Sequence, residues 1–355
     1  MSVIQNQLHI AAITAVAFLC CDCSGRPTQG VLVPSATSAV GSSRIPELVA
    51  TTRRPSTADA GEMFNGERAE GVSYASITVS IPPDSARKIG QVQWPASMPG
   101  DPSRDFVTVT ADRFDKTAFN AAISSAAKST GRNKVLVFVH GYNNRFDEAV
   151  YRLAQIVQDS KAPVIPVLFS WPSKGLLQLS AYKDDVDSAN ASRVALAQLL
   201  RTIALNRDVK EVTVLCHSMG CLPTLEVLRA KDKVKSVLLV APDVDVDHFH
   251  AEVQRIGNPK PVIALFGARD DQALKLSKLV WGGKARLGDV NPNEEPYRSE
   301  FRRDGVHVFD LTSMKGDSHS RAFEDMNSVM GMIEERLAEG QQMTVGESTP
   351  VEASQ

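Results

Sequence analysis

The chain has 355 residues, of which 43% are hydrophobic and 23% are charged, as is typical of a folded globular protein. Lys and Arg number 39 and Asp and Glu 41, so the formal net charge is -2. No basic block stands out along the chain, which argues against a nucleic-acid partner. The length allows one large domain or two smaller ones.

The N-terminus differs from the rest of the chain. Residues 8–21 (LHIAAITAVAFLCC) form an apolar run that is shorter than the about 20 residues of a membrane span but suits the core of a secretory signal. Cys20, Cys21 and Cys23 end or follow this run, which suggests a lipoprotein signal with one acylated cysteine that would anchor the protein to a membrane. A signal that is simply cleaved is the alternative, since no Lys or Arg precedes the run. We therefore expect residues 1–23 to be a signal-like segment of an exported protein of the cell envelope or periplasm.

Composition also marks the borders of the folded domain, which we expect over residues 66–338. Residues 24–65 are rich in Pro, Ser, Thr and Gly without helical periodicity, so they are predicted to form a flexible tether. Residues 339–355 are polar and predicted to be disordered. The domain begins with residues 72–81 and 105–110, where apolar and polar residues alternate as in half-buried strands at a sheet edge.

From residue 134 onward, apolar runs that predict buried strands alternate with segments of helical periodicity. Long helices are expected at about 185–206 and 320–337. Six strand–helix units in succession predict an α/β fold with a doubly wound, mostly parallel sheet and helices on both faces. In such sheets, ligands bind outside the carboxyl ends of the strands. The predicted strands cover residues 134–139, 164–169, 212–215, 237–241, 262–266 and 306–311.

The segment 211–221 indicates a buried strand, a tight turn and then a helix, with Ser218 at the turn. Gly220 follows two residues later, as in the nucleophile elbow Gly-x-Ser-x-Gly of α/β-hydrolases. Cys216 stands where that pattern has its first glycine, which weakens the match although cysteine is small. We interpret Cys216 and Cys221 as small packing residues on opposite sides of the turn and expect no disulfide between them.

The turn after the first core strand, at residues 140–144, has the sequence HGYNN. Its glycine allows a sharp turn that leaves backbone amides directed at the site. We expect the amides of Tyr142 and Met219 to form an oxyanion hole. The alternative is an ordinary strand-to-helix turn.

An acid and a histidine follow two later strands. Asp270 is the predicted partner of a histidine Nδ1–H, with Asp271 and Asp243 as alternatives. Asp270 and Asp271 are also suited to cap the helix that follows. His319 is the predicted base, because the order Ser218, Asp270, His319 is the one that the α/β-hydrolase fold requires.

Two segments are candidates for a substrate pocket. Residues 171–182 include Trp171, Leu176 and Leu177 in a loop, where apolar side chains are unexpected. Residues 281–303 form a long connection that is suited to a cap. The alternative for both is packing against the body of the domain.

Several of these motifs together resemble the bacterial α/β-hydrolases of the DUF900 group, which are described as esterase- or lipase-like and often have lipoprotein-like N-termini. The resemblance covers roughly residues 72 to 337 and implies the hydrolase fold and a serine nucleophile, without implying a substrate. The motifs that carry it are Val135–Asn144, Phe169–Ser173, Cys216–Gly220, Ala241–Asp243 and His319-Ser320.

The sequence therefore predicts a serine hydrolase that cleaves a carboxylic ester or related acyl compound, either a small molecule or a lipid-like one. His319 would take the proton of Ser218, and Asp270 would orient His319. This chemistry requires no metal and no organic cofactor. The alternatives are a non-catalytic binding module of the cell envelope on the same scaffold, or an acyltransferase that forms the same acyl-enzyme.

Overall fold

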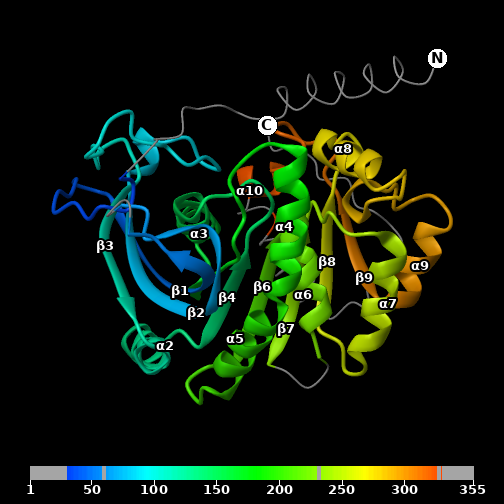
Figure 1. The fold of residues 1–355 in the computed structure, drawn as a ribbon, viewed down its shortest axis with the longest axis horizontal. Helices are drawn as coiled ribbons and strands as arrows, with labels where there is room; N and C mark the ends of the chain where they lie inside the picture. Colours follow the sequence, from blue (N-terminus) through cyan, green and yellow to red (C-terminus); the bar gives the residue numbers. More distant parts are fainter. Residues whose placement is uncertain (1–29, 58–60, 230–232, 326–328, 330–355) are drawn as a thin grey trace.

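The computed structural model describes residues 30–57, 61–229, 233–325 and residue 329. The predicted signal-like segment at 1–23 and the predicted tail at 339–355 lie outside the described residues. A single nine-stranded sheet, in the order β3-β2-β1-β5-β4-β6-β7-β8-β9, runs through the described part (Figure 1).

The six strands predicted from residue 134 onward are all present, and each pairs in parallel with its neighbours. Their apolar runs are continuous because both faces of the sheet are covered. In β4, Val135, Val137 and Val139 face one core, while Leu136 and Phe138 face the other. These strands are β4 (Lys134–Val139), β5 (Ile165–Ser170), β6 (Glu211–His217), β7 (Val234–Val240), β8 (Val262–Gly267) and β9 (Val306–Asp310).

Helices cover both faces, so the predicted α/β fold with a doubly wound, mostly parallel sheet is confirmed. One face is covered by α2 (Lys116–Thr130), α4 (Leu179–Ala191), α5 (Arg193–Leu205), α6 (Cys221–Val227) and α7 (Val246–Ile256). The other face is covered by α3 (Phe146–Ser160) and α10 (Arg321–Glu324). Figure 1 shows α4, α5 and α6 crossing in front of the strands.

Shorter elements complete the C-terminal half. They are α8 (Gln272–Val280), α9 (Tyr297–Asp304) and the 3-10 turns η2 (Ser218–Gly220) and η3 (Leu287–Asp289), with η1 (Asp84–Ala86) nearer the N-terminus. The helix predicted at about 185–206 is divided between α4 and α5, which meet at Ser192. Within the described residues, no helix is both long and apolar enough to cross a membrane.

The N-terminal strands differ from the prediction. β1 (Ser43–Pro55) lies inside the sheet, antiparallel to β2 (Phe64–Ile81) and parallel to β5. The prediction of a flexible tether over residues 24–65 is therefore wrong for residues 43–55. β3 (Val107–Phe114) pairs with β2 at the sheet edge, as expected. The tether prediction failed because β1 has only a short apolar run, and the strand is stabilised by partners that lie far along the chain.

The position of β1 can be tested with two substitutions in the same strand. Val49 is completely buried between β2 and β5, whereas Arg54 is exposed. We expect Val49→Asp to lower the free energy of unfolding by about 3 kcal/mol or more, because it buries a carboxylate without a partner. Arg54→Ser should change it by less than about 0.5 kcal/mol. Equally small effects in denaturant titrations would show that this segment is a tether after all.

Candidate active site

The turn at Ser218 is strained and closely packed. Ser218 has φ 50°, which is rare for a residue other than glycine and costs about 1–3 kcal/mol. A Cβ atom added to Gly220 would lie 2.2 Å from the carbonyl oxygen of His140, and one added to Gly141 would lie 2.9 Å from Ser218 Cβ. Only glycine fits at either position, so the turn has the form of the predicted elbow.

A disulfide joins the two ends of this turn, contrary to the prediction. Cys216 ends the apolar part of β6, Cys221 begins α6, and both are buried with their Cα atoms 5.0 Å apart. That separation is within the range for a disulfide. The prediction assumed that the two cysteines lie on opposite sides of the turn. The reversal from strand to helix instead brings both side chains into the same core.

The acid that contacts His319 is Asp271, the alternative to the predicted Asp270. His319 Nδ1 lies 2.7 Å from Asp271 Oδ2, and the Asp271 carboxylate is completely buried. Asp271 also caps α8, because its Oδ1 accepts a hydrogen bond from the amide of Leu274 at 3.0 Å. Asp271 therefore combines the two roles that the sequence left as alternatives: one oxygen contacts the histidine and the other caps the helix.

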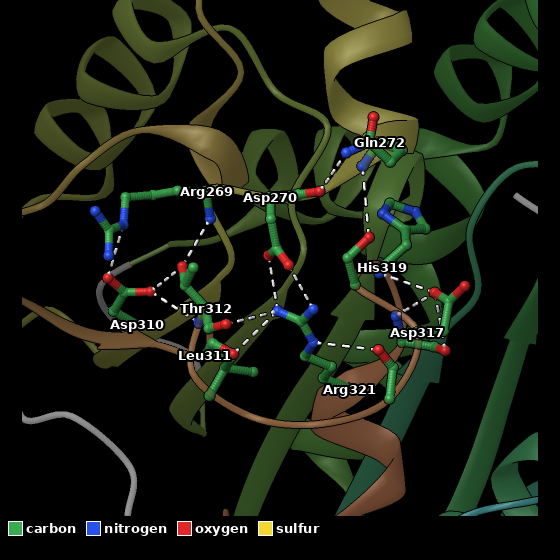
Figure 2. Close-up of polar contacts among 12 residues, drawn as sticks. Arg269, Asp270, Gln272, Asp310, Leu311, Thr312, Asp317, His319 and Arg321 are labelled. Atoms are coloured by element: carbon green, nitrogen blue, oxygen red, sulfur yellow. Dashed lines mark hydrogen bonds and ion pairs between the residues drawn. The ribbon is translucent and has the colours of Figure 1, made fainter. Parts of the chain in front are cut away.

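Asp270 has a different partner, so the prediction that it orients His319 is wrong. Its two oxygens accept hydrogen bonds from Arg321 at 2.7 and 2.6 Å, as Figure 2 shows. Asp270 lies in the turn that follows β8, whereas Asp271 is the N-cap of α8. Only Asp271 contacts His319.

The ionisation of His319 and Asp271 is coupled. Burial acts to lower the pKa of His319, but the Asp271 carboxylate outweighs burial and the pKa is raised above its ordinary value. Burial acts to raise the pKa of Asp271, and the contact with His319 outweighs it, so that pKa is lowered. The pair therefore favours a protonated imidazole beside an ionised carboxylate, which is the state that a general base reaches after it has taken a proton.

His217, which precedes Ser218, supports the segment that carries His319. Its ring centroid lies 4.8 Å from that of His319, and its Nε2–H donates to the backbone carbonyl of His319 at 3.0 Å. Burial, followed by the neighbouring His319, lowers the pKa of His217 to about 3, so His217 is neutral at neutral pH. The sequence analysis gave this histidine no role, although its place directly before the serine was a visible signal.

The turn at residues 140–144 lies against the elbow through Gly141. The hydroxyl of Tyr142 donates to the carbonyl of Leu176 at 2.7 Å and accepts from the amide of Gln178 at 2.9 Å. Met219 is buried in η2 directly after Ser218. Met219 thus directly follows Ser218, and Tyr142 directly follows the glycine that contacts Ser218. Their role in oxyanion binding stays a prediction.

A buried arginine from β1 supports the same turn from behind. Arg53 Nε donates to Ser170 Oγ at 2.8 Å, and its two terminal nitrogens donate to the carbonyls of Ser173 at 2.9 Å and Asn144 at 2.7 Å. Ser170 Oγ is 3.0 Å from His140 Nε2. Burial lowers the pKa of Arg53 to about 10, and burial together with the charge of Arg53 lowers that of His140 to about 3. At neutral pH the network therefore holds a charged arginine and a neutral histidine.

Trp171 does not line a pocket, so this part of the prediction is wrong. It is completely buried, its ring stacks on His140 with centroids 5.0 Å apart, and its Nε1 donates to the His140 carbonyl at 2.8 Å. The sequence could not separate an apolar loop residue that lines a site from one that packs beneath it. Leu176 and Leu177 are exposed.

Asp243, the other alternative acid, is held by a different set of partners. Its Oδ1 accepts from Ser277 Oγ at 2.6 Å and from Arg286 Nε at 2.8 Å, and its Oδ2 accepts from Tyr182 OH at 2.8 Å. Its backbone amide donates to the carbonyl of Ser218 at 3.2 Å. Asp243 therefore joins the elbow to α4 and to the segment after α8, and its charge adds to the rise in the pKa of His319.

Residues 115–336 match the family model described as "Alpha/beta hydrolase of unknown function (DUF900)", which is more than half of the chain. The chain is a member of the DUF900 family. Among curated proteins, none matches this DUF900 chain.

Solved structures similar to this DUF900 protein are hydrolases by title. The Pyrococcus furiosus esterase Pf2001 is 13% identical, with a TM-score of 0.34, and the match covers 59% of this chain and 84% of the esterase. The siderophore hydrolase EstB of Aspergillus nidulans is 14% identical, with a TM-score of 0.36 and coverage of 84% and 97%. A putative hydrolase of Bacillus subtilis is 13% identical, with a TM-score of 0.28 and coverage of 75% and 88%. Because all three TM-scores are below 0.5, the fold assignment rests on the sheet topology and the family match.

In the part of this DUF900 chain that the structure describes, no group of three or more His, Cys, Asp or Glu side chains is arranged to hold a metal ion. His250 contacts Asp304 and, at 3.0 Å, Glu300.

The two aspartates can be distinguished by the titration of His319. We expect Asp271→Asn to lower the pKa of His319, because burial then acts without the opposing carboxylate. Asp270→Asn should leave it nearly unchanged, since Asp270 faces Arg321. NMR titration of the His319 ring in the two variants and the wild type measures this directly. A larger shift in Asp270→Asn than in Asp271→Asn would contradict the contact described above.

Proposed function

We propose that this protein is a serine hydrolase that cleaves a carboxylic ester or related acyl compound through an acyl-enzyme on Ser218. The observation that carries the proposal is the 2.7 Å contact between His319 Nδ1 and the buried carboxylate of Asp271, next to a strained serine turn. A serine, a histidine and an acid in this chain order are the parts that acyl transfer in α/β-hydrolases requires.

In the proposed reaction, His319 Nε2 takes the proton of Ser218 Oγ while that oxygen attacks the carbonyl carbon of the ester. The charged imidazole is stabilised by Asp271, and it then gives the proton to the leaving alcohol. Water, activated by the same histidine, attacks the acyl-enzyme and releases the acid. The coupled pKa shifts of His319 and Asp271 favour the charged intermediate of this cycle.

The developing oxyanion is proposed to accept hydrogen bonds from the amides of Tyr142 and Met219. The close contact between Gly141 and Ser218, the bond from Tyr142 to the 176–178 segment and the Arg53 network behind the turn support this assignment, because they hold the turn in place before substrate arrives. Preorganised donors of this kind need no rearrangement during the reaction.

Ser218 Oγ and His319 Nε2 are not hydrogen-bonded in this structure, although both residues are described. In enzymes without substrate such bonds are often long and tighten only in the complex.

The serine can be tested by labelling with a fluorophosphonate probe. Purified wild type should be labelled on Ser218, and Ser218→Ala should not be labelled. Ser180 is exposed on α4, so Ser180→Ala is the matched control and should be labelled as the wild type is. Mass spectrometry of the labelled peptide identifies the site.

Absence of labelling in the folded wild type would refute the proposal and leave a binding module on a hydrolase scaffold. Labelling combined with acyl transfer to an added alcohol in preference to water would identify an acyltransferase with the same acyl-enzyme. The products of the ester turnover separate these two outcomes.

The pH dependence of kcat/KM follows from the raised pKa of His319. A general base must be neutral, so activity should be present above this pKa and fall as pH decreases through a value above the ordinary histidine pKa of about 6.5. Asp271→Asn should move this acid limb to lower pH and reduce kcat by roughly 10⁴-fold, as loss of the acid does in such sites. An acid limb well below pH 6 in the wild type would contradict the assignment of His319 as the base.

A further inference from the structure

Exposed apolar side chains gather on two segments at the end of the sheet where Ser218 lies. Leu176, Leu177 and Leu179 are 50%, 40% and 47% exposed. At the end of α8, Leu279 and Trp281 are 68% and 41% exposed. Single exposed apolar residues need no explanation, but a group of them marks a binding surface.

The two segments are joined to each other and to the elbow. Tyr142, next to the glycine that touches Ser218, bonds to the backbone of Leu176, and its ring lies 5.3 Å from that of Tyr182. Tyr182 OH in turn accepts from Trp281 Nε1 at 2.9 Å. In Figure 1 the start of α4 and the helix α8 both lie along the upper edge of the view. The exposed apolar side chains therefore border the approach to the proposed nucleophile.

The charges within these two segments are all basic. Residues 171–183 and 272–288 contain no Asp or Glu, although Asp184 and Asp289 follow them directly. The basic residues of the two segments are Lys174, Lys183, Lys275, Lys278, Lys284 and Arg286. The charges of Lys275 and Lys278 act on Asp289 without forming an ion pair with it.

Some of these basic groups are engaged with acids of the protein. Lys174 pairs with Glu67, Lys284 pairs with Asp245, and Arg286 is buried against Asp243. The other three, Lys183, Lys275 and Lys278, form no ion pair with any part of the chain that the structure describes. An apolar surface with lysines around it is thus left facing outward.

We propose that this docking surface, formed by Leu176, Leu177, Leu179, Leu279 and Trp281 with Lys183, Lys275 and Lys278, binds an anionic phospholipid bilayer. Leucine and tryptophan side chains would enter the headgroup region while the lysines contact lipid phosphates. If the proposed hydrolase activity holds, the acyl substrate is then one that resides in or at the bilayer. The location of the substrate rests on the proposed function, whereas the docking does not.

A lipid surface fits these residues better than a protein partner does. Protein interfaces are depleted in lysine, whereas lysine combined with tryptophan and leucine is the composition of surfaces that lie on anionic membranes. A second copy of this chain would place like charges against each other, which disfavours association.

The docking is tested with the full chain carrying Ser218→Ala, so that no turnover alters the vesicles. Trp281 is the reporter, because Trp171 is completely buried and Trp94 stacks on Tyr151. With phosphatidylglycerol vesicles, we expect the tryptophan emission to shift to the blue and to be quenched by brominated acyl chains. Both signals should disappear in Trp281→Phe and be much smaller with phosphatidylcholine vesicles. Because the blue shift and the quenching come from Trp281, they report contact of this surface with the vesicle even if another part of the chain also binds it.

Two matched substitutions locate the contact. Leu177→Asp should lower the affinity for phosphatidylglycerol vesicles, read from the Trp281 emission, by about tenfold. The substitution removes a leucine from the bilayer and adds a negative charge. Leu205→Asp alters a leucine at the end of α5 that is 71% exposed and lies outside the docking surface, so it should leave the signal unchanged.

An unchanged Trp281 emission on anionic vesicles, or equal losses in Leu177→Asp and Leu205→Asp, would overturn the proposal. So would a blue shift that appears without vesicles as protein concentration rises, since this would show a second copy on the surface. Wild-type protein that docks but is not labelled by a fluorophosphonate would refute the proposed hydrolase and leave the docking surface in place. Labelling without docking would refute the docking surface and leave the proposed hydrolase in place.

Discussion

The packing around Ser218 is the constraint on which the rest of the site depends. A residue other than glycine is held at positive φ, and it stays there because the turn after β4 and the turn after β6 are in direct contact through Gly141 and Gly220. The disulfide between Cys216 and Cys221 closes the turn across its base, and the amide of Asp243 binds the serine carbonyl. Because no larger side chain fits at either glycine, the buried serine can keep this backbone conformation only while these neighbours stay in place.

Among the three histidines around this turn, His140, His217 and His319, only His319 has a pKa raised above its ordinary value. Burial holds the pKa values of His140 and His217 at about 3, so both act as neutral hydrogen-bonding groups. His319 is partly buried, but the carboxylate of Asp271, followed by those of Asp243 and Asp317, opposes the effect of burial, and its pKa is raised. Asp270, one residue earlier, is hydrogen-bonded to Arg321 and does not contact His319. The difference between His319 and the other two histidines is the buried carboxylate within hydrogen-bonding distance.

The supports of the site come from distant parts of the chain and also position its surroundings. Arg53 on β1 binds the carbonyls of Asn144 and Ser173 and thereby fixes the turn that approaches Ser218. On the other side, Asp243 binds Tyr182 and Arg286, so the start of α4 and the segment after α8 are tied to the elbow. The exposed leucines and lysines of these two segments are consequently held in a fixed position relative to the serine. The proposed reaction centre and the proposed docking surface are therefore held by the same set of contacts.

The sequence by itself determined the features that depend on neighbouring residues. The apolar runs of β4 to β9 have both faces buried, so composition alone marks them, and the elbow at Ser218 and the place of His319 after the last strand follow from local order. Tertiary structure decided the rest. β1 is a strand only because β2 and β5 pair with it from both sides, and the side-chain directions of Asp270 and Asp271 depend on Arg321 and His319. The disulfide and the burial of Trp171 likewise arise from contacts formed when the turns close. Local sequence does not determine which residues these contacts bring together.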